Sequence, residues 1–497
     1  MLKTRKAGRG PLRKGAVLAL VAVLLVVLVG MLALVLDGGL LQDDRRGAQA
    51  AADAASLAGA TELFKNYTLI TPSTTPPLWD PSGAADSAAK SSATTNGFPN
   101  NNTTSTVEVH IPPTSGPFTG QQGCVEVIVT YYQKRYFSTI WGSTQIPVKA
   151  RAVARARYGG TGAGIVILDP TADHALDATG AGSSTTESVN VTGGATVYVD
   201  SSDPTAARTS GGGSMTAAAF KVYGSYTGSG FTPTPTALAC PIPDPLCYLP
   251  QPSVPSNNGT ITQTSTLTKT TKTKTTVTTT TITTTGMSST TTTTSTNIIP
   301  PLNGSTDGTT PNTYTLTPGK YGTNGTPLPK PGNGDTVQFT QQDSSGNGGI
   351  YYIDGGGWSF TGSPNFQMAP LAANADPTTT GGIMIYNAPT STASSEGISW
   401  NGSGTMTLSA LKQGPYAGIL LWQDRTSPVT MSVTGGNSDL EGTFYAANAL
   451  LKITGQGTAT IGSQYISRTL GISGSGSINI NYTDQGTARM REVMLVE

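Results

Sequence analysis

The chain has 497 residues, of which 36% are hydrophobic and only 11% are charged, whereas a charged share of about 25% is usual. Its 29 Lys and Arg and 28 Asp and Glu give a formal net charge of +1, and six of the cations precede residue 16. The rest of the chain holds 23 cations against 28 acids, which argues against a nucleic-acid partner. Low charge and 61 glycines fit a β-rich exported protein better than a cytosolic enzyme.

The first predicted element is a transmembrane helix over residues 16–36. This run is uncharged and apolar, and it follows six cations, at Lys3, Arg5, Lys6, Arg9, Arg13 and Lys14. A helix of this length reaches about 31 Å, the hydrocarbon thickness of a bilayer. The basic flank predicts that residues 1–15 are a cytoplasmic tail and that the bulk of the chain is periplasmic or extracellular, anchored in the inner (cytoplasmic) membrane. A cleaved signal peptide is the alternative, although its apolar core usually has only about 7–15 residues.

An alanine-rich juxtamembrane helix is predicted over residues 37–66. Its alanines recur on one face at helical spacing, at Ala48, Ala51, Ala52, Ala55 and Ala58. Such a strip lets another helix approach closely, and a plain juxtamembrane helix is the alternative. Glycines at 38, 39 and 47 weaken the helix without ending it.

The apolar run and the segment after it together resemble the N-terminus of TadG-like proteins, which are linked to bacterial Flp (Tad) pilus assembly. In that family an apolar helix ends in Asp-x-Gly and continues into a Gln-x-Ala-Ala-Asp-Ala-Ala-like stretch. The matching positions are Asp37, Gly39, Gln49, Ala51, Ala52, Asp53, Ala54 and Ala55. The resemblance implies two kinds of partner: the lipid bilayer and, through the N-terminal helix, other Tad pilus-assembly or envelope proteins. Pilins of that system are cut after a glycine and carry glutamate at the fifth mature position. Leu20 stands there after Gly15, so we predict no cleavage at Gly15.

Residues 67–157 are predicted to form a small α+β unit. Runs at Thr106–Ile111, Val125–Tyr132 and Ile146–Arg157 have the alternating or continuous apolar pattern of strands. In the last run one face is Val148, Ala150, Ala152 and Ala154, and the other is Lys149, Arg151, Val153, Arg155 and Arg157. A solvated strand face explains this row of arginines better than nucleic-acid binding.

Beyond residue 158 a unit of short apolar strands around a Ser/Thr/Asn-Gly turn recurs, for example around Gly435, Gly455 and Gly474. These glycines are 20 and 19 residues apart. A repeat of this length predicts a parallel β-solenoid-like exodomain in two blocks, residues 158–257 and 300–482. Val433, Ile453 and Ile472 should then occupy equivalent inward positions, with Lys452 outward. An antiparallel β-sandwich is the alternative. The fold class is therefore mainly β with an N-terminal transmembrane helix.

The two blocks are separated by residues 258–299, a nearly pure threonine tract that is predicted to be a linker. Residues 483–497 are predicted to be a C-terminal tail. Cys240 and Cys247 flank a short proline-stiffened loop and are the candidate disulfide pair, whereas Cys124 lies in an apolar strand and should be a buried thiol.

No catalytic, cofactor-binding or metal-ligating set is predicted. The two histidines, His110 and His174, are far from the cysteines in sequence, so no zinc-site spacing exists. We therefore expect a non-enzymatic structural or adhesive protein without cofactors. The alternative is a membrane-anchored carbohydrate-binding or carbohydrate-active β-helix protein, for which Asp424, Asp439 and Glu441 would have to gather around one groove.

Overall fold

The structure is a computed structural model that describes residues 14–65, 80, 82–121, 123–136, 139, 142, 144–159, 162–180, 188–270, 275–299, 308–343, 348–371, 380–483 and 486–497. It divides into two compact units. Unit 1 is Met1–Tyr158 with Arg491–Glu497, and unit 2 is Gly159–Met490. Unit 2 is thus inserted between two segments of unit 1.

The described part of unit 1 consists of two α-helices and one four-stranded sheet. Helix α1 (Lys14–Lys65) is a single helix through both of the predicted N-terminal helices, so its glycines do not end it. The sheet has the order β1-β2-β3-β34, and β1, β2 and β3 pair antiparallel. Its elements are α2 (Ala84–Thr95), β1 (Ser105–His110), β2 (Cys124–Gln133), β3 (Ile146–Gly159) and β34 (Met490–Leu495).

The inward face predicted for β3 is confirmed, because Val148, Ala150, Ala152 and Ala154 are buried. The solvated opposite face is only partly so: Lys149 is exposed, whereas Arg151 is half-buried and Val153 is 0% exposed. The predicted C-terminal tail is wrong, because β34 completes the sheet beside β3: Val153 N donates to Glu497 O at 2.8 Å and Val496 N donates to Val153 O at 2.9 Å. The sequence of β34, MREVML, has two adjacent charged residues followed by three apolar ones, so it lacks the alternation from which the other strands were predicted.

Unit 2 is built from three rows of short strands, and within each row all neighbours pair in parallel. Row 1 contains, in spatial order, β19 (Gly319–Tyr321), β21 (Gly349–Asp354), β24 (Ile383–Ala388), β27 (Ile419–Gln423), β30 (Thr443–Gly455), β32 (Gln464–Gly474), β4 (Ala163–Ile167), β7 (Thr196–Val199), β10 (Ala219–Val222) and β13 (Thr236–Ala237). Strands β30 and β32 are long and bend, so that their second halves belong to row 2.

Row 2 contains β22 (Trp358–Gly362), β25 (Ile398–Gly402), β28 (Met431–Gly435), β30, β32, β5 (Leu176–Gly180), β8 (Ala207–Ser210) and β11 (Tyr226–Thr227). Row 3 contains β18 (Thr313–Leu316), β20 (Thr336–Phe339), β23 (Asn365–Met368), β26 (Met406–Ser409), β29 (Ser438–Glu441), β31 (Thr458–Ile461), β33 (Ser477–Asn481), β6 (Ser188–Thr192), β9 (Ser214–Thr216) and β12 (Phe231–Thr232). Through most of the unit the chain visits row 1, row 2 and row 3 in turn before it returns to row 1. The parallel pairing excludes the antiparallel sandwich.

The core of unit 2 runs between the rows. Val433, Ile453 and Ile472 are in register in row 2 and are 0%, 0% and 3% exposed, as predicted, whereas Lys452 is exposed. Corner glycines are in register too: Gly474 has φ +137°, and a Cβ there would lie 2.1 Å from the carbonyl oxygen of Gly455. Only glycine allows the two corners to stack so closely.

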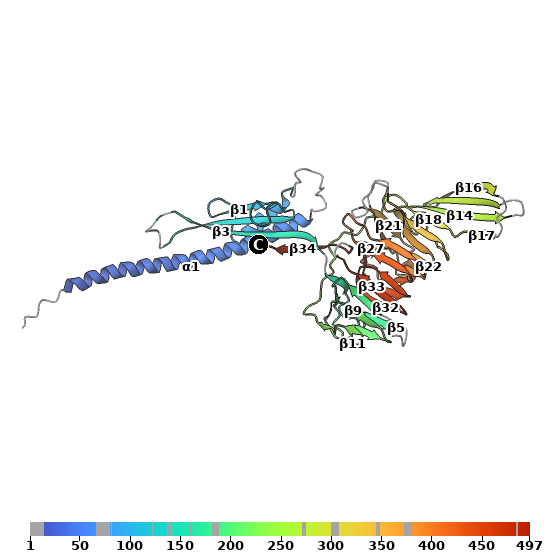
Figure 1. The fold of residues 1–497 in the computed structure, drawn as a ribbon. Helices are drawn as coiled ribbons and strands as arrows, with labels where there is room; N and C mark the ends of the chain where they lie inside the picture. The colour runs from blue at the N-terminus through green and yellow to red at the C-terminus, as the bar shows by residue number, and fades with distance from the viewer. Residues whose placement is uncertain are drawn as a thin grey trace, which may run out of the picture. The chain divides into compact units, whose positions relative to one another are not determined.

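The two predicted blocks are in fact one continuous stack. The last strands of the second block pair with the first strands of the first block: β32 pairs with β4 and β5, and β33 pairs with β6. Figure 1 shows the green strands β5 and β9 beside the red strands β32 and β33. The chain therefore enters the stack in its middle, runs to one end, crosses to the other end and returns. The sequence repeats could not predict this spatial order, because similar repeats do not indicate which of them are neighbours in the stack.

The threonine tract is also strand, which corrects the predicted linker. Strands β14 (Thr260–Thr270), β15 (Thr275–Thr285) and β16 (Ser288–Ile299) form an antiparallel sheet, and β14 joins it to row 3 through β18. The short strand β17 (Gly308–Thr309) also pairs with β14, and η3 (Ser394–Glu396) is a single 3-10 turn. Threonine is polar and β-branched, so it favours strands even where little apolar surface is buried.

Candidate functional site

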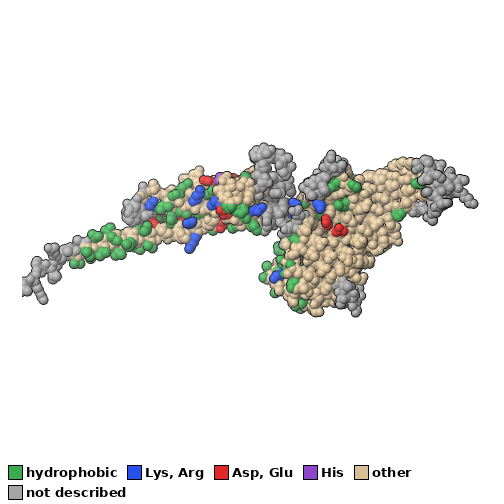
Figure 2. Space-filling view, viewed as in Figure 1, with side chains coloured by type: hydrophobic (Ala, Val, Ile, Leu, Met, Phe, Trp, Pro, Cys, Tyr) green, Lys and Arg blue, Asp and Glu red, His purple; other side chains and the backbone are tan. Residues whose placement is uncertain are grey.

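The first half of α1 is an apolar rod. Every Val, Leu and Met from Val17 to Leu36 is exposed, with side-chain exposures between 42% and 78%. Sixteen such residues cover all faces of a helix, so no one face is reserved for a protein core. Within the described residues this is the one helix long and apolar enough to cross a membrane, and Figure 2 shows its green surface.

The second half of the same helix is part of the core of unit 1. Ala48, Ala52 and Ala55 are fully buried against the apolar faces of α2 and of strands β1–β3. The packing is tight at Gly59, where a Cβ would lie 3.0 Å from Val125 Cγ1 and 3.2 Å from Ala85 O. The alanine strip therefore does admit a second helix, but that helix is α2 of the same chain.

The family-motif residues have two structural roles. Ala51, Ala52 and Ala55 are fully buried, whereas Ala54 and Asp53 are half-buried. Gln49 Nε2 donates to Asp53 Oδ1 at 2.8 Å and to the carbonyl oxygen of Arg151 at 3.0 Å, so it ties α1 to the backbone of β3. Gly39 has open space around its Cα, and Asp37 belongs to the same continuous helix.

A buried carboxylate lies on the face of the sheet that is opposite to the helices. Glu126, in β2, is 0% exposed and accepts hydrogen bonds from Thr114 N at 2.9 Å, from the Thr114 and Ser115 hydroxyls, and from Arg151 Nε. Arg151 also binds Glu497 Oε1 at 2.7 Å. Burial opposes ionisation of Glu126, but these donors outweigh it and lower the pKa of the carboxyl to about 2. The arginine row thus contributes an internal ion pair.

The sequence does carry a signal for this network. Glu126 is the single charged residue of the apolar strand Cys124–Gln133, and a buried acid requires a cation or several donors. In the same strand Cys124 is buried, as predicted, and burial raises the pKa of its thiol.

The three acids named for a carbohydrate-active site lie in two different rows of unit 2. Asp439 and Glu441 are exposed on β29 in row 3, and Glu441 lies 3.9 Å from Lys412. Asp424 follows β27 in row 1, where it accepts hydrogen bonds from Tyr386 Oη at 2.8 Å and from Thr426 N at 2.8 Å. Burial opposes its ionisation, yet these bonds lower its pKa. Asp424 therefore has a structural role that does not involve Asp439 or Glu441.

A strap, residues 238–257, covers the outer face of row 1. Leu246 and Leu249 are buried there in a second apolar cluster with Trp422 and Tyr445. Arg425 fixes the strap: Nη1 donates to Leu249 O at 2.7 Å, Nη2 donates to Leu246 O, and Nε donates to Tyr445 Oη at 2.6 Å.

Two further contacts complete the Arg425 cluster. Tyr445 Oη donates to Asp244 Oδ2 at 2.6 Å, and the Arg425 guanidinium carbon lies 5.2 Å from the Trp422 ring centroid. Burial and the neighbouring Asp244 raise the pKa of Tyr445. The sequence fragment Trp422–Arg425 thus holds a strap in place. The strap also carries Cys240 and Cys247, which are exposed free thiols in the structure; their pairing stays a prediction.

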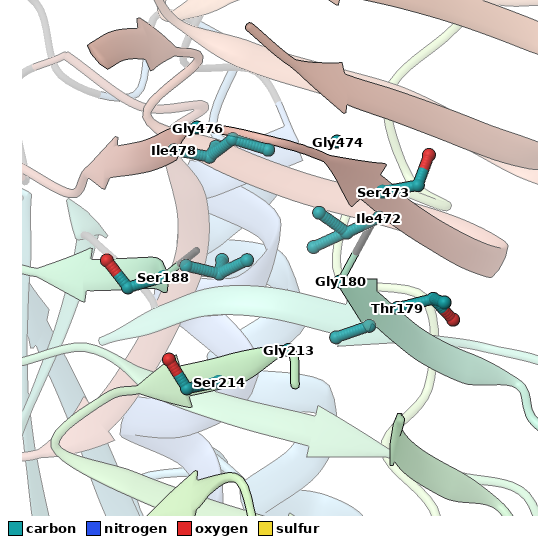
Figure 3. A pocket seen from close by; sticks show the side chains of 12 residues that line it. Thr179, Gly180, Ser188, Gly213, Ser214, Ile472, Ser473, Gly474, Gly476 and Ile478 are labelled. Carbon is teal, nitrogen blue, oxygen red and sulfur yellow. The ribbon is translucent and has the colours of Figure 1, made fainter. Parts of the chain in front are cut away.

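The junction of the two blocks contains a small cavity of about 20 Å³ (Figure 3). Its lining comes from both blocks, with Ile472 and Ile478 from β32 and β33 and with Ser188 and Ser214 from β6 and β9. This volume holds about one water molecule, so the cavity is a packing gap rather than a ligand site. Within the described residues no group of three or more His, Cys, Asp or Glu lies close enough to hold a metal ion.

Comparison with known families identifies the N-terminal segment. Residues 15–62 match the family described as "Putative Flp pilus-assembly TadE/G-like". The chain therefore carries a TadE/G-like N-terminal segment, which confirms the resemblance read from Asp37 to Ala55. The match covers most of α1 and none of unit 2. No curated protein and no solved structure matches the chain.

Proposed function

We propose that this chain is a non-enzymatic, single-pass envelope protein of the Tad pilus-assembly type, with its N-terminus in the cytoplasm and unit 2 outside the inner membrane. In this proposal unit 2 is a three-sided parallel β-solenoid that serves as a structural or adhesive display. The observation that carries the proposal is that α1 is one uninterrupted helix, apolar on every face over Val17–Leu36 and then part of the core of unit 1. A rigid link of this kind holds a folded unit at the membrane surface.

The exterior of unit 2 supports a display role. The face seen in Figure 2 is mostly uncharged polar surface. Ladders of hydroxyl and amide side chains run along the rows, for example Thr179 Oγ1 to Ser210 Oγ at 3.2 Å and Asn190 Nδ2 to Asn479 Oδ1 at 3.1 Å. Such a surface is soluble and repetitive, and it requires no catalytic group.

Thiol labelling of the intact chain tests the orientation. Spheroplasts are treated with a membrane-impermeant maleimide, with and without reductant. We expect Cys240 and Cys247, which are exposed, to be labelled before the membrane is opened, and Cys124, which is buried, to stay unlabelled. Labelling only after reduction would in addition confirm the predicted disulfide.

The matched variants alter charge on the two sides of the span. Replacing the six N-terminal cations with Gln should yield a mixture of orientations, because these residues hold the N-terminus inside. Replacing Arg45 and Arg46, which are exposed after the span, should leave labelling unchanged. Labelling of the native chain only after membrane disruption would overturn the proposed topology.

A further inference from the structure

Strand β16 forms the outer edge of the threonine sheet, which consists of β14, β15 and β16. Strand β16 is the last in its sheet and pairs only with β15 among the described strands. It has twelve residues and contains no charged residue, proline or glycine. Its single register shift lies at the Ile299 end. Exposed edges normally carry charges, prolines or bulges, because unpaired N–H and C=O groups recruit other strands.

Two other edges of the same unit do have such protection. At β22, the last strand of row 2, Trp358 Nε1 donates to the carbonyl oxygen of Pro329 at 3.0 Å, which attaches a proline-rich segment, residues 327–331, to this end of the row. At the opposite end of the stack, β12 and β13 have only two residues each and are separated by Pro233 and Pro235. Within the described residues, the long edge of β16 therefore lacks the features found at these two other edges.

The side chains of the sheet form a regular grid. On one face every second residue is threonine, from Thr262 to Thr266 on β14, from Thr279 to Thr283 on β15 and from Thr290 to Thr294 on β16, and these are in register. Hydroxyls of neighbouring strands approach each other: Thr260 Oγ1 lies 2.9 Å from Thr285 Oγ1, and Thr266 Oγ1 lies 3.4 Å from Thr279 Oγ1. Cross-strand threonine pairs of this kind stabilise antiparallel strands.

We propose that β16 pairs antiparallel with β16 of a second copy of this chain, forming a closed dimer through one continuous threonine sheet. The sequence supports a second copy as the occupant. With the twofold axis at Thr292, each threonine of the run 290–294 lies opposite a threonine, and no charge meets a like charge. The dimer uses the β16 edge of each of its two chains. The assembly therefore closes at two chains and does not extend into a fibre.

Cysteine substitution tests the register in the full-length chain. In a Cys240→Ser, Cys247→Ser background, a cysteine placed at Thr292 should form an interchain disulfide on mild oxidation. Directly opposed residues in an antiparallel pair have Cα atoms about 5 Å apart, within disulfide range. Thr281, in register with Thr292 on β15, is the matched control. Its two copies would be separated by three strand spacings, about 14 Å, so Thr281→Cys should not cross-link.

Thr293→Lys supplies the second measurement. Thr293 is an exposed edge residue, so a lysine there should protect the edge without unfolding the sheet. We expect the native chain in detergent to form dimers in analytical ultracentrifugation and the variant to dissociate at concentrations at least tenfold higher, with hydrogen exchange of β14 and β15 unchanged. A native monomer at every concentration, open-ended oligomers, cross-linking of Thr281→Cys equal to that of Thr292→Cys, or a dimer unaffected by Thr293→Lys would each overturn the proposal. None of these results depends on membrane orientation.

Discussion

Replacing Ile453 with Asp tests the register of unit 2 directly. Ile453 is fully buried in row 2, between Val433 and Ile472. Truncating such an isoleucine costs about 2–5 kcal/mol, and burying a carboxyl group without a partner adds about 2 kcal/mol or more. The total of about 4–7 kcal/mol compares with the roughly 5–15 kcal/mol that usually stabilises a domain. We therefore expect the strands around β30 to lose their ordered packing.

The location of the damage is the sharper part of this prediction. Ile472 is itself in register with Ala178 of β5, so the disturbance should pass from β30 through β32 to strands encoded far earlier in the sequence. Hydrogen exchange of the full-length variant should show lost protection at residues 431–474 and also at residues 163–180. The strands of unit 1, which have a separate core, should keep their protection.

The control is the neighbouring residue. Lys452 is exposed on the same strand, so Lys452→Asp should change protection little. Ile453→Val, which removes one methyl group, should cost about 1 kcal/mol and give a graded, local effect. Equal losses for Lys452→Asp and Ile453→Asp would refute the inward and outward assignment. Normal protection at residues 163–180 in Ile453→Asp would refute the continuous stack.

Two further predictions concern buried charge. Because the pKa of Glu126 is about 2 in the folded chain against an ordinary 4.5, its ionisation stabilises unit 1 by about 3 kcal/mol above pH 4.5, and this is lost as the pH falls towards 2. Glu126→Gln should therefore lower the melting temperature most at pH 7 and much less at pH 2, whereas Glu108→Gln, at an exposed position of β1, should change it little; equal losses for the two variants at pH 7 would contradict this. Removing the Arg425 guanidinium leaves two strap carbonyls and a tyrosine without their donor, at a cost of about 3 kcal/mol. Limited proteolysis of Arg425→Met should cut within residues 238–257 faster than in the control Arg208→Met, which removes a more exposed ion pair; equal rates would refute the role of Arg425.

Much of the local structure could be predicted from the sequence pattern, whereas the contacts between distant parts of the chain could not. The inward position of Ile453 follows from alternation along a strand, and the burial of Ala48 and Ala55 follows from helical spacing. The threonine tract was misread because its polarity suggested a linker, while the β-propensity of threonine decided the outcome. The partners of Glu126 and Arg425 lie on other elements, so a single strand's sequence could show at most that a partner was required.

The insertion of unit 2 into unit 1 explains why the chain enters the stack of strands in the middle of the stack. The chain leaves unit 1 from β3 and returns to it in β34, and these two strands are neighbours in one sheet, about 4.8 Å apart. An inserted unit must therefore have its own entrance and exit close together. A stack wound from one end to the other would separate them by the ten strands of row 1, about 43 Å. Entering at β4 and leaving after β33 solves this constraint, since β4 lies beside β32 and Gly162 N donates to Tyr482 Oη at 2.8 Å. The strap is the consequence, because the chain must cross from one end of the stack to the other, and the Arg425 cluster is what holds that crossing against row 1.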